Sequence, residues 1–295
     1  MTIQHQILDF YTRPAAMTSS RRHAPVFAEL PHDVAALARV AQGLLLHEHA
    51  APLYGVALAD ERRSEVHIRP VEGMLDRLLA YESRPLSVAR PVEARLVGVC
   101  RHFTVLLVAM LRSKGVPARA RCGFGTYFKP GHFYDHWVCE YWKAAEARWI
   151  RVDAQLDEVQ RAELKVDFDP LDVPHDRFVI AGDAWAQCRG GKADPAKFGI
   201  FDMRGLWFIA GNVVRDVAAL NNMEMLPWDV WGAMLRPDEP PQNDQLALFD
   251  RLAALTRELD ASFKELRKLY EGDDRLRVPP VVFNALRNAP EMITS

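Results

Sequence analysis

A cysteine, a histidine and an aspartate are spaced along the chain so that they could work as one catalytic group. Cys100 directly precedes the most apolar stretch of the sequence, and His136 and Asp153 lie in later, strand-like stretches. A thiolate can attack an acyl carbon, a histidine can take up and return the proton, and a carboxylate can hold that histidine in one tautomer. The three residue types therefore predict covalent chemistry at an acyl carbon.

The position of Cys100 suits a nucleophile. The apolar residues after it predict a buried helix from about residue 99 to residue 114, which the sequence Gly-Val-Pro at 115–117 would end. A cysteine in the first turn of a helix faces unpaired backbone N–H groups and the positive end of the helix dipole, and both favour the thiolate. Arg101 and His102 are expected to add positive charge beside it.

Three strand-like stretches follow this helix, at residues 118–128, 132–142 and 147–155. Their short connections favour antiparallel neighbours. His136 would then lie in the second strand and Asp153 in the third, so that their side chains could sit side by side and face the start of the helix.

The rest of the chain is expected to surround this core. Residues 1–30 are poorly patterned and predict a partly ordered N-terminal arm. A single catalytic domain is expected over 31–235, followed by a proline-containing linker and a long amphipathic helix packed on the domain within 236–295. Helical spacing of apolar residues predicts three further helices at 31–46, 71–83 and 244–270.

Composition narrows the class of protein. The chain has 295 residues, 49% apolar and 26% charged, with a formal net charge of -2, so neither nucleic acid nor a membrane is an expected partner. Four cysteines without a C-x-x-C pair do not form a disulfide framework, and the first twenty residues lack the pattern of a secretory signal. We therefore expect a cytoplasmic protein with reduced thiols and no cofactor.

Three segments together resemble one protein family. These are GVCRHFTVLLVAMLRSKGVPARARCGF (98–124), DHWVCEYW (135–142) and WIRVDAQ (149–155). They are similar to the core of the transglutaminase-like superfamily, in which a cysteine opens a buried helix that ends in Gly-(Ile/Val)-Pro-Ala-Arg. A histidine in the second strand and an aspartate in the third complete that core.

The resemblance implies a fold and an activity. The implied fold is α+β and papain-like, with the nucleophile helix packed on an antiparallel sheet and additional helices at both ends of the chain. Cys100 would be the nucleophile, His136 the base and Asp153 the residue that orients it. Members of the superfamily act on amide and acyl bonds as transglutaminases, peptidases, peptide N-glycanases or deamidases.

These implications define an expected function. The protein would be a cysteine hydrolase or acyltransferase that forms an acyl-enzyme on an amide- or peptide-containing substrate. The identity of the substrate, the choice between water and an amine as acceptor, and the oligomeric state stay open. Candidate substrate contacts are Trp137, Arg101, His102, Trp207 and Asn212.

Two alternatives to this function also stay open. Many superfamily members place a Trp or Gln side chain shortly before the cysteine to complete the oxyanion hole, whereas no Trp or Gln occurs between Gln42 and Cys100. The backbone N–H of Cys100 supplies one donor and the second is unassigned. A catalytically silent binding or scaffold protein is therefore the first alternative.

The second alternative is a zinc site built from His132, His136 and Cys139. Four residues along a strand separate the two imidazoles by about 13 Å, which is too far for one metal ion. Because the aromatic residues and the preceding Pro-Gly turn favour a strand here, the sequence predicts no metal site.

Overall fold

The computed structural model describes residues 2–237 and 239–293. The described residues divide into two compact units, which are described separately. Unit 1 comprises residues 2–120 and 138–173, and unit 2 comprises residues 121–137, 174–237 and 239–293. Unit 1 continues across residue 30 and unit 2 across residue 235, so the division expected at those positions remains a prediction.

The fold is α+β, with helix α6 packed on a mainly antiparallel sheet, as the sequence predicted. Helix α6 (Cys100–Ser113) is buried at every residue from Cys100 to Arg112. A helix that is covered on all sides has no polar face, which explains the continuous apolar run in its sequence. Gly115 follows the helix at a φ of 75°, a left-handed conformation that glycine adopts without strain.

The N-terminal segment is part of unit 1. It contains α1 (Ile3–Thr12) and α2 (Ala24–Ala28), and the side chains of Ile7 and Tyr11 are buried. The guanidinium of Arg119 lies 5.4 Å from the ring centroid of Tyr11 and 3.8 Å from that of Trp149. These cation–π contacts tie the first helix to two strands of the same unit.

Unit 1 also holds the helices that surround α6. Val34–Leu44 forms α3 and Val71–Tyr81 forms α5, close to the predicted ranges. Strand β1 (Leu45–His47) pairs in parallel with β2 (Leu96–Gly98), which leads into α6. Unit 1 also contains the short helices α4 (Asp60–Arg63) and α7 (Glu158–Glu163).

The three predicted strands are present as β3 (Ala118–Gly125), β4 (Phe133–Lys143) and β5 (Arg148–Val152). Strands β4 and β5 pair antiparallel, with Cys139 opposite Val152. The strand order of the sheet is β6-β3-β4-β7-β8, with β5 also paired to β4. The added strands are β6 (Phe178–Ile180), β7 (Phe198–Ile200) and β8 (Met203–Arg204).

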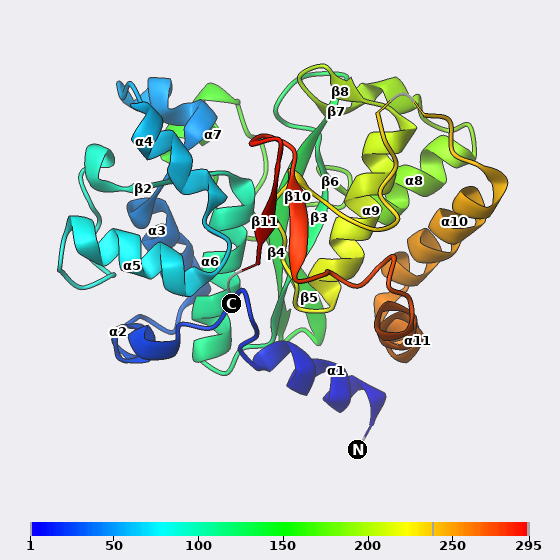
Figure 1. Cartoon of the computed structure of the whole chain (residues 1–295). Coiled ribbons are helices and arrows are strands. Elements are labelled where there is room, and N and C mark those ends of the chain that lie inside the picture. The colour runs from blue at the N-terminus through cyan, green and yellow to red at the C-terminus, as the bar shows by residue number, and fades with distance from the viewer. Residues whose placement is uncertain (1, 238, 294–295) are drawn as a thin grey trace. The chain divides into compact units, whose positions relative to one another are not determined.

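Unit 2 packs helices α8 (Ala181–Arg189), α9 (Leu206–Leu220) and α10 (Asn243–Arg257) against one another (Figure 1). Helix α9 is almost entirely buried, which accounts for its apolar sequence. A separate three-stranded sheet follows the order β11-β10-β9. Its strands are β9 (Asp229–Val230), β10 (Val281–Asn284) and β11 (Ala289–Met292).

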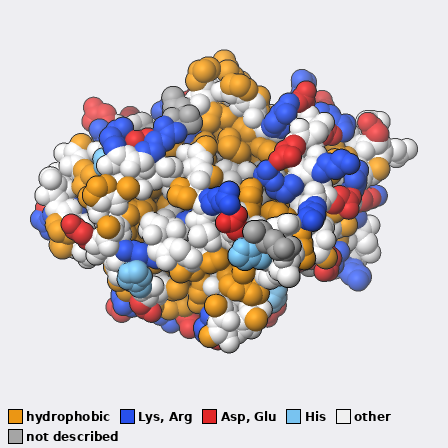
Figure 2. Space-filling view, turned by 90° about the horizontal axis from the view of Figure 1, so that it is seen from below, with side chains coloured by type: hydrophobic (Ala, Val, Ile, Leu, Met, Phe, Trp, Pro, Cys, Tyr) orange, Lys and Arg blue, Asp and Glu red, His pale blue; other side chains and the backbone are white. Residues whose placement is uncertain are grey.

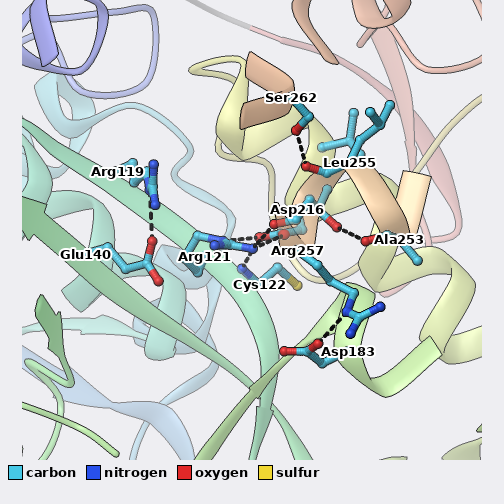
Figure 3. Close-up of polar contacts among 12 residues, drawn as sticks. Arg119, Arg121, Cys122, Glu140, Asp183, Asp216, Ala253, Leu255, Arg257 and Ser262 are labelled. Atoms are coloured by element: carbon cyan, nitrogen blue, oxygen red, sulfur yellow. Dashed lines mark hydrogen bonds and ion pairs between the residues drawn. The ribbon is translucent and has the colours of Figure 1, made fainter. Parts of the chain in front are cut away.

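The single long helix predicted for residues 244–270 is wrong, because the chain forms two helices there. Helix α10 ends at Arg257 and α11 (Leu259–Gly272) begins after Glu258, whose φ and ψ of -105° and 43° interrupt the first helix. The hydroxyl of Ser262 donates a hydrogen bond of 2.5 Å to the carbonyl of Leu255 (Figure 3). A side chain thus satisfies a carbonyl that the break in the helix frees.

Each unit buries charged side chains as pairs (Figure 3). In unit 1, Glu140 accepts hydrogen bonds from the Nε atoms of Arg119 at 2.8 Å and Arg151 at 3.0 Å. In unit 2, Arg121 binds Asp216 through two bonds of 3.0 and 2.8 Å. Paired charges of this kind offset the cost of removing each group from water.

On the surface shown in Figure 2, lysine and arginine side chains are interspersed with aspartate and glutamate. Over the described part of the chain, every helix is too short or too polar to cross a membrane.

Candidate active site

Cys100 is the first residue of α6, as the sequence predicted. Val99 has an extended conformation, so strand β2 passes into the helix without a connecting loop. The side chain of Cys100 is 7% exposed. This local path places the thiol at the end of the helix where the backbone N–H groups point outward.

His102 has a structural role at the same helix start. Its Nδ1 accepts the backbone N–H of Val99 at 3.1 Å, and its Nε2 lies 3.0 Å from the carbonyl oxygen of Ile68, to which it can donate. Burial, with a smaller effect of the Arg101 charge, lowers the pKa of His102 to about 3. The imidazole is therefore neutral near pH 7, and the expectation that it adds positive charge beside Cys100 is wrong.

Arg101 is also buried, and its Nη1 donates a hydrogen bond of 2.6 Å to the carbonyl of Arg69. This bond holds the segment that leads into α5. The charge of Arg101 remains next to Cys100 in the chain. The substrate contacts predicted for Arg101 and His102 remain predictions, whereas the contacts described for both side chains are structural.

Asp153 follows β5 directly and is buried. Its backbone N–H donates to the carbonyl of Pro170 at 2.8 Å, and its Oδ1 accepts the backbone N–H of Gln155 at 3.0 Å. The carboxylate thus shapes the turn that ends the strand, because an aspartate side chain can bond the backbone two residues on.

His136 lies on β4 within unit 2 and is 2% exposed. Aromatic rings surround its imidazole. The ring centroids of Phe128, Tyr127 and Phe178 lie 4.8, 5.8 and 6.3 Å from that of His136, all three edge-to-face. Packing against three rings restricts the orientation of the imidazole.

Asp135, Asn212 and Arg215 form a buried polar chain that the sequence did not predict. Asn212 donates to Asp135 at 2.7 Å and accepts from the Nη1 of Arg215 at 3.1 Å. Burial raises the pKa of Asp135, against the opposing effects of Arg215 and Asn212. The amide of Asn212, predicted as a substrate contact, therefore bridges β4 and α9. The position of Asp135 directly before His136 is the only sequence signal for this chain of contacts.

Trp137 and Trp207 differ in their surroundings. Successive side chains on a strand alternate between faces, so Trp137 points away from the face that carries His136. The Trp137 side chain is buried, and among the described residues its indole N–H has no hydrogen-bond partner. Trp207 is partly exposed at the start of α9, with its ring edge-on to Phe208 at 5.5 Å.

The structure describes each residue of the expected triad within its own unit. Cys100 and Asp153 belong to unit 1, and His136 belongs to unit 2. The arrangement of the three as one catalytic group therefore remains a prediction, as do the substrate contacts.

The alternative zinc site finds no support in the described residues, where no three His, Cys, Asp or Glu side chains are grouped to hold a metal ion. Partial burial and the charges of Lys129 and Arg204 lower the pKa of His132, whose Nδ1 lies 3.3 Å from the Nη1 of Arg204. Burial raises the pKa of the Cys139 thiol. Since zinc binds the thiolate, that burial works against metal binding.

The sequence matches the model of one protein family. A model of the transglutaminase-like superfamily matches residues 55–154, a span that includes Cys100, His136 and Asp153. No curated protein matches the sequence.

A solved structure from Cytophaga hutchinsonii, named a putative cysteine protease, is similar at 17% sequence identity and a TM-score of 0.33. The match covers 61% of this chain and 49% of that protein, so the chain spans about half the length of its structural relative. Over residues 55–154, the chain is therefore similar to the transglutaminase-like superfamily.

Proposed function

We propose that the protein is a thiol-dependent enzyme that acts on an amide or acyl bond. Cys100 is the nucleophile, His136 the general base and acid, and Asp153 the residue that orients His136. The observation that carries the proposal is the position of Cys100 as the first residue of α6, inside the span that matches the superfamily.

The chemistry follows from these roles. The Cys100 thiolate attacks the substrate carbonyl carbon to form a C–S bond, and the protonated His136 gives its proton to the leaving amine as the C–N bond breaks. Water or a second amine then attacks the acyl-enzyme and loses a proton to His136. The product is released and the thiol is regenerated, so the reaction is either hydrolysis or acyl transfer.

The pairing of β4 and β5 supports the roles of His136 and Asp153. The two strands are antiparallel neighbours, with Cys139 opposite Val152. His136 lies three residues before Cys139 along β4, and Asp153 follows Val152 directly. This is the strand arrangement that a histidine–aspartate pair requires.

The proposed setting is the cytoplasm, which agrees with all four cysteines being thiols. The proposed substrate is an amide or a peptide, and the proposed mechanism uses no cofactor.

A catalytically silent binding protein is the second candidate. One observation favours it, because the nearest glutamine before Cys100 is engaged elsewhere. Gln42 donates through its Nε2 to the carbonyl of Leu156 at 3.3 Å. Only the backbone N–H of Cys100 is then assigned as an oxyanion donor, and loss of one such donor slows acyl transfer by roughly a hundredfold or more.

The rate of iodoacetamide alkylation at each cysteine, followed against pH by peptide mass spectrometry, tests the proposal. Cys188 is the internal reference for an unactivated thiol, because it is partly exposed and burial raises its pKa to about 11. We expect Cys100 to react fastest, to remain reactive below pH 8, and to slow at least about tenfold in His136→Ala. The matched control His132→Ala should leave the rate unchanged. A Cys100 that reacts no faster than Cys188, or equally fast without His136, would favour the silent binding protein.

A further inference from the structure

The rings beside His136 differ in their exposure. Phe178, whose ring centroid lies 6.3 Å from that of the imidazole, is fully buried. Tyr127 and Phe128, from the loop that joins β3 to β4, are partly exposed, and so is Tyr134, two residues before His136 on the same face of β4. The Phe128 ring links the group, with centroids 4.6 Å from Tyr127 and 6.2 Å from Tyr134. We call Tyr127, Phe128 and Tyr134 the aromatic wall.

The loop that carries two of these rings is held in place. The backbone N–H of Thr126 donates to the carbonyl of Arg177 at 3.0 Å. The Tyr127 and Phe128 rings fold back over Gly125, where an added Cβ would lie 2.7 Å from the Phe128 Cε2 and 3.1 Å from the Tyr127 Cζ. A Cβ at this position would push the Phe128 ring away, so glycine at position 125 lets the ring pack where it does.

We propose that the aromatic wall binds an aromatic or branched apolar group carried on the leaving amine of the substrate. This inference rests on the proposed function, in which His136 delivers its proton to that amine. The leaving group must therefore lie within hydrogen-bond reach of the imidazole. Partly exposed rings of unit 2 lie beside that imidazole, and an apolar group that covers them gains roughly 25 cal/mol per Å² removed from water.

Paired chloroacetamides test the inference. N-methyl and N-benzyl chloroacetamide both alkylate a thiolate by forming a C–S bond and releasing chloride, and they differ only in the group on the amide nitrogen. We expect the second-order rate constant at Cys100, measured by peptide mass spectrometry, to be about tenfold higher for the N-benzyl reagent. The benzyl-to-methyl ratio should fall toward one in Phe128→Ala and in Gly125→Ala, and to an intermediate value in Phe128→Leu, which keeps an apolar side chain.

The control is Phe201→Ala, which removes an aromatic side chain that is 55% exposed elsewhere in unit 2 and should leave the ratio unchanged. A wild-type ratio near one, or a high ratio that persists in Phe128→Ala, overturns the inference. The N-methyl reagent separates this failure from that of the proposed function. If the N-methyl rate depends on His136 while the benzyl-to-methyl ratio is near one, the inference is wrong and the proposed function stands. If the N-methyl rate is independent of His136, both the inference and the proposed function are wrong.

Discussion

The two histidines near the proposed chemistry are held in different ways. His102, in unit 1, is fixed by backbone groups at both ring nitrogens and is fully buried. His136, in unit 2, packs against the buried ring of Phe178 and the partly exposed rings of Tyr127 and Phe128. The histidine closest to Cys100 in sequence thus has a structural role, whereas the contacts described for the distant one are with aromatic rings.

The contrast shows what each region tolerates. At the start of α6, every polar group of His102 has a partner whose loss leaves a buried donor or acceptor unsatisfied. Around the aromatic wall, the contacts described are ring packing, and the three rings of the wall are partly exposed. Substitutions at the helix start should therefore affect stability, and those at the wall should affect reactivity.

The largest stability loss is expected for His102→Ala. The substitution leaves the Val99 N–H and the Ile68 carbonyl without the imidazole as hydrogen-bond partner, and it leaves a cavity. The free energy of unfolding should therefore fall by about 3 to 5 kcal/mol. Urea titration measures this. The matched control His32→Ala alters an exposed side chain and should change the value by less than about 0.5 kcal/mol. A small effect at His102 would remove the contrast between the two histidines.

Acidification should produce the next largest effect. Since folding lowers the pKa of His102 to about 3 from an ordinary value near 6.5, the unfolded state takes up the proton first. The stability from the neutral imidazole is complete above pH 6.5 and is lost as the pH falls toward 3, by up to about 1.4 kcal/mol per pH unit.

His102→Asn isolates this contribution, because asparagine keeps an acceptor for the Val99 N–H and does not titrate. The difference in unfolding free energy between wild type and His102→Asn should narrow from pH 6.5 to pH 4. A constant difference over that window would show that His102 titrates normally in the folded protein.

Gly98→Ala should have a moderate effect. A Cβ at Gly98 would stand 2.8 Å from the Cβ of His102, whose ring is fixed at both nitrogens and cannot move away. We expect a loss of about 1 to 3 kcal/mol in urea titration. If the double variant Gly98→Ala with His102→Gly loses less than the sum of the two single losses, the clash is with the His102 side chain, whereas simple additivity of the two losses would place it elsewhere.

The sequence predicted the elements with strong local patterns and missed those set by tertiary contacts. The apolar run after Cys100 marked α6, and alternation marked β3, β4 and β5. Strands β6, β7 and β8 have only two or three residues each, too few to show a period. The leucine spacing continues through Glu258, so it gave no sign of the break between α10 and α11.

The site residues show the same difference between local features, which the sequence reveals, and contacts between distant segments, which it does not. The position of Cys100 could be read from the chain because a helix start is a local feature. The neutral state of His102 could not, since it depends on burial and on the carbonyl of Ile68, which is far away in sequence. The bridge from Asp135 through Asn212 to α9 is likewise a contact between distant segments.

The smallest stability change is expected at the aromatic wall. It tests whether the rings near His136 contribute less to stability than the contacts of His102 do. Phe128→Leu removes a partly exposed ring whose partners are other rings, so the free energy of unfolding should fall by less than about 1 kcal/mol. The same variant should lower the benzyl-to-methyl ratio at Cys100. If Phe128→Leu instead lowers the free energy of unfolding as much as Gly98→Ala does, the Phe128 ring is part of the core. The aromatic wall would then be too deeply packed to bind a substrate group.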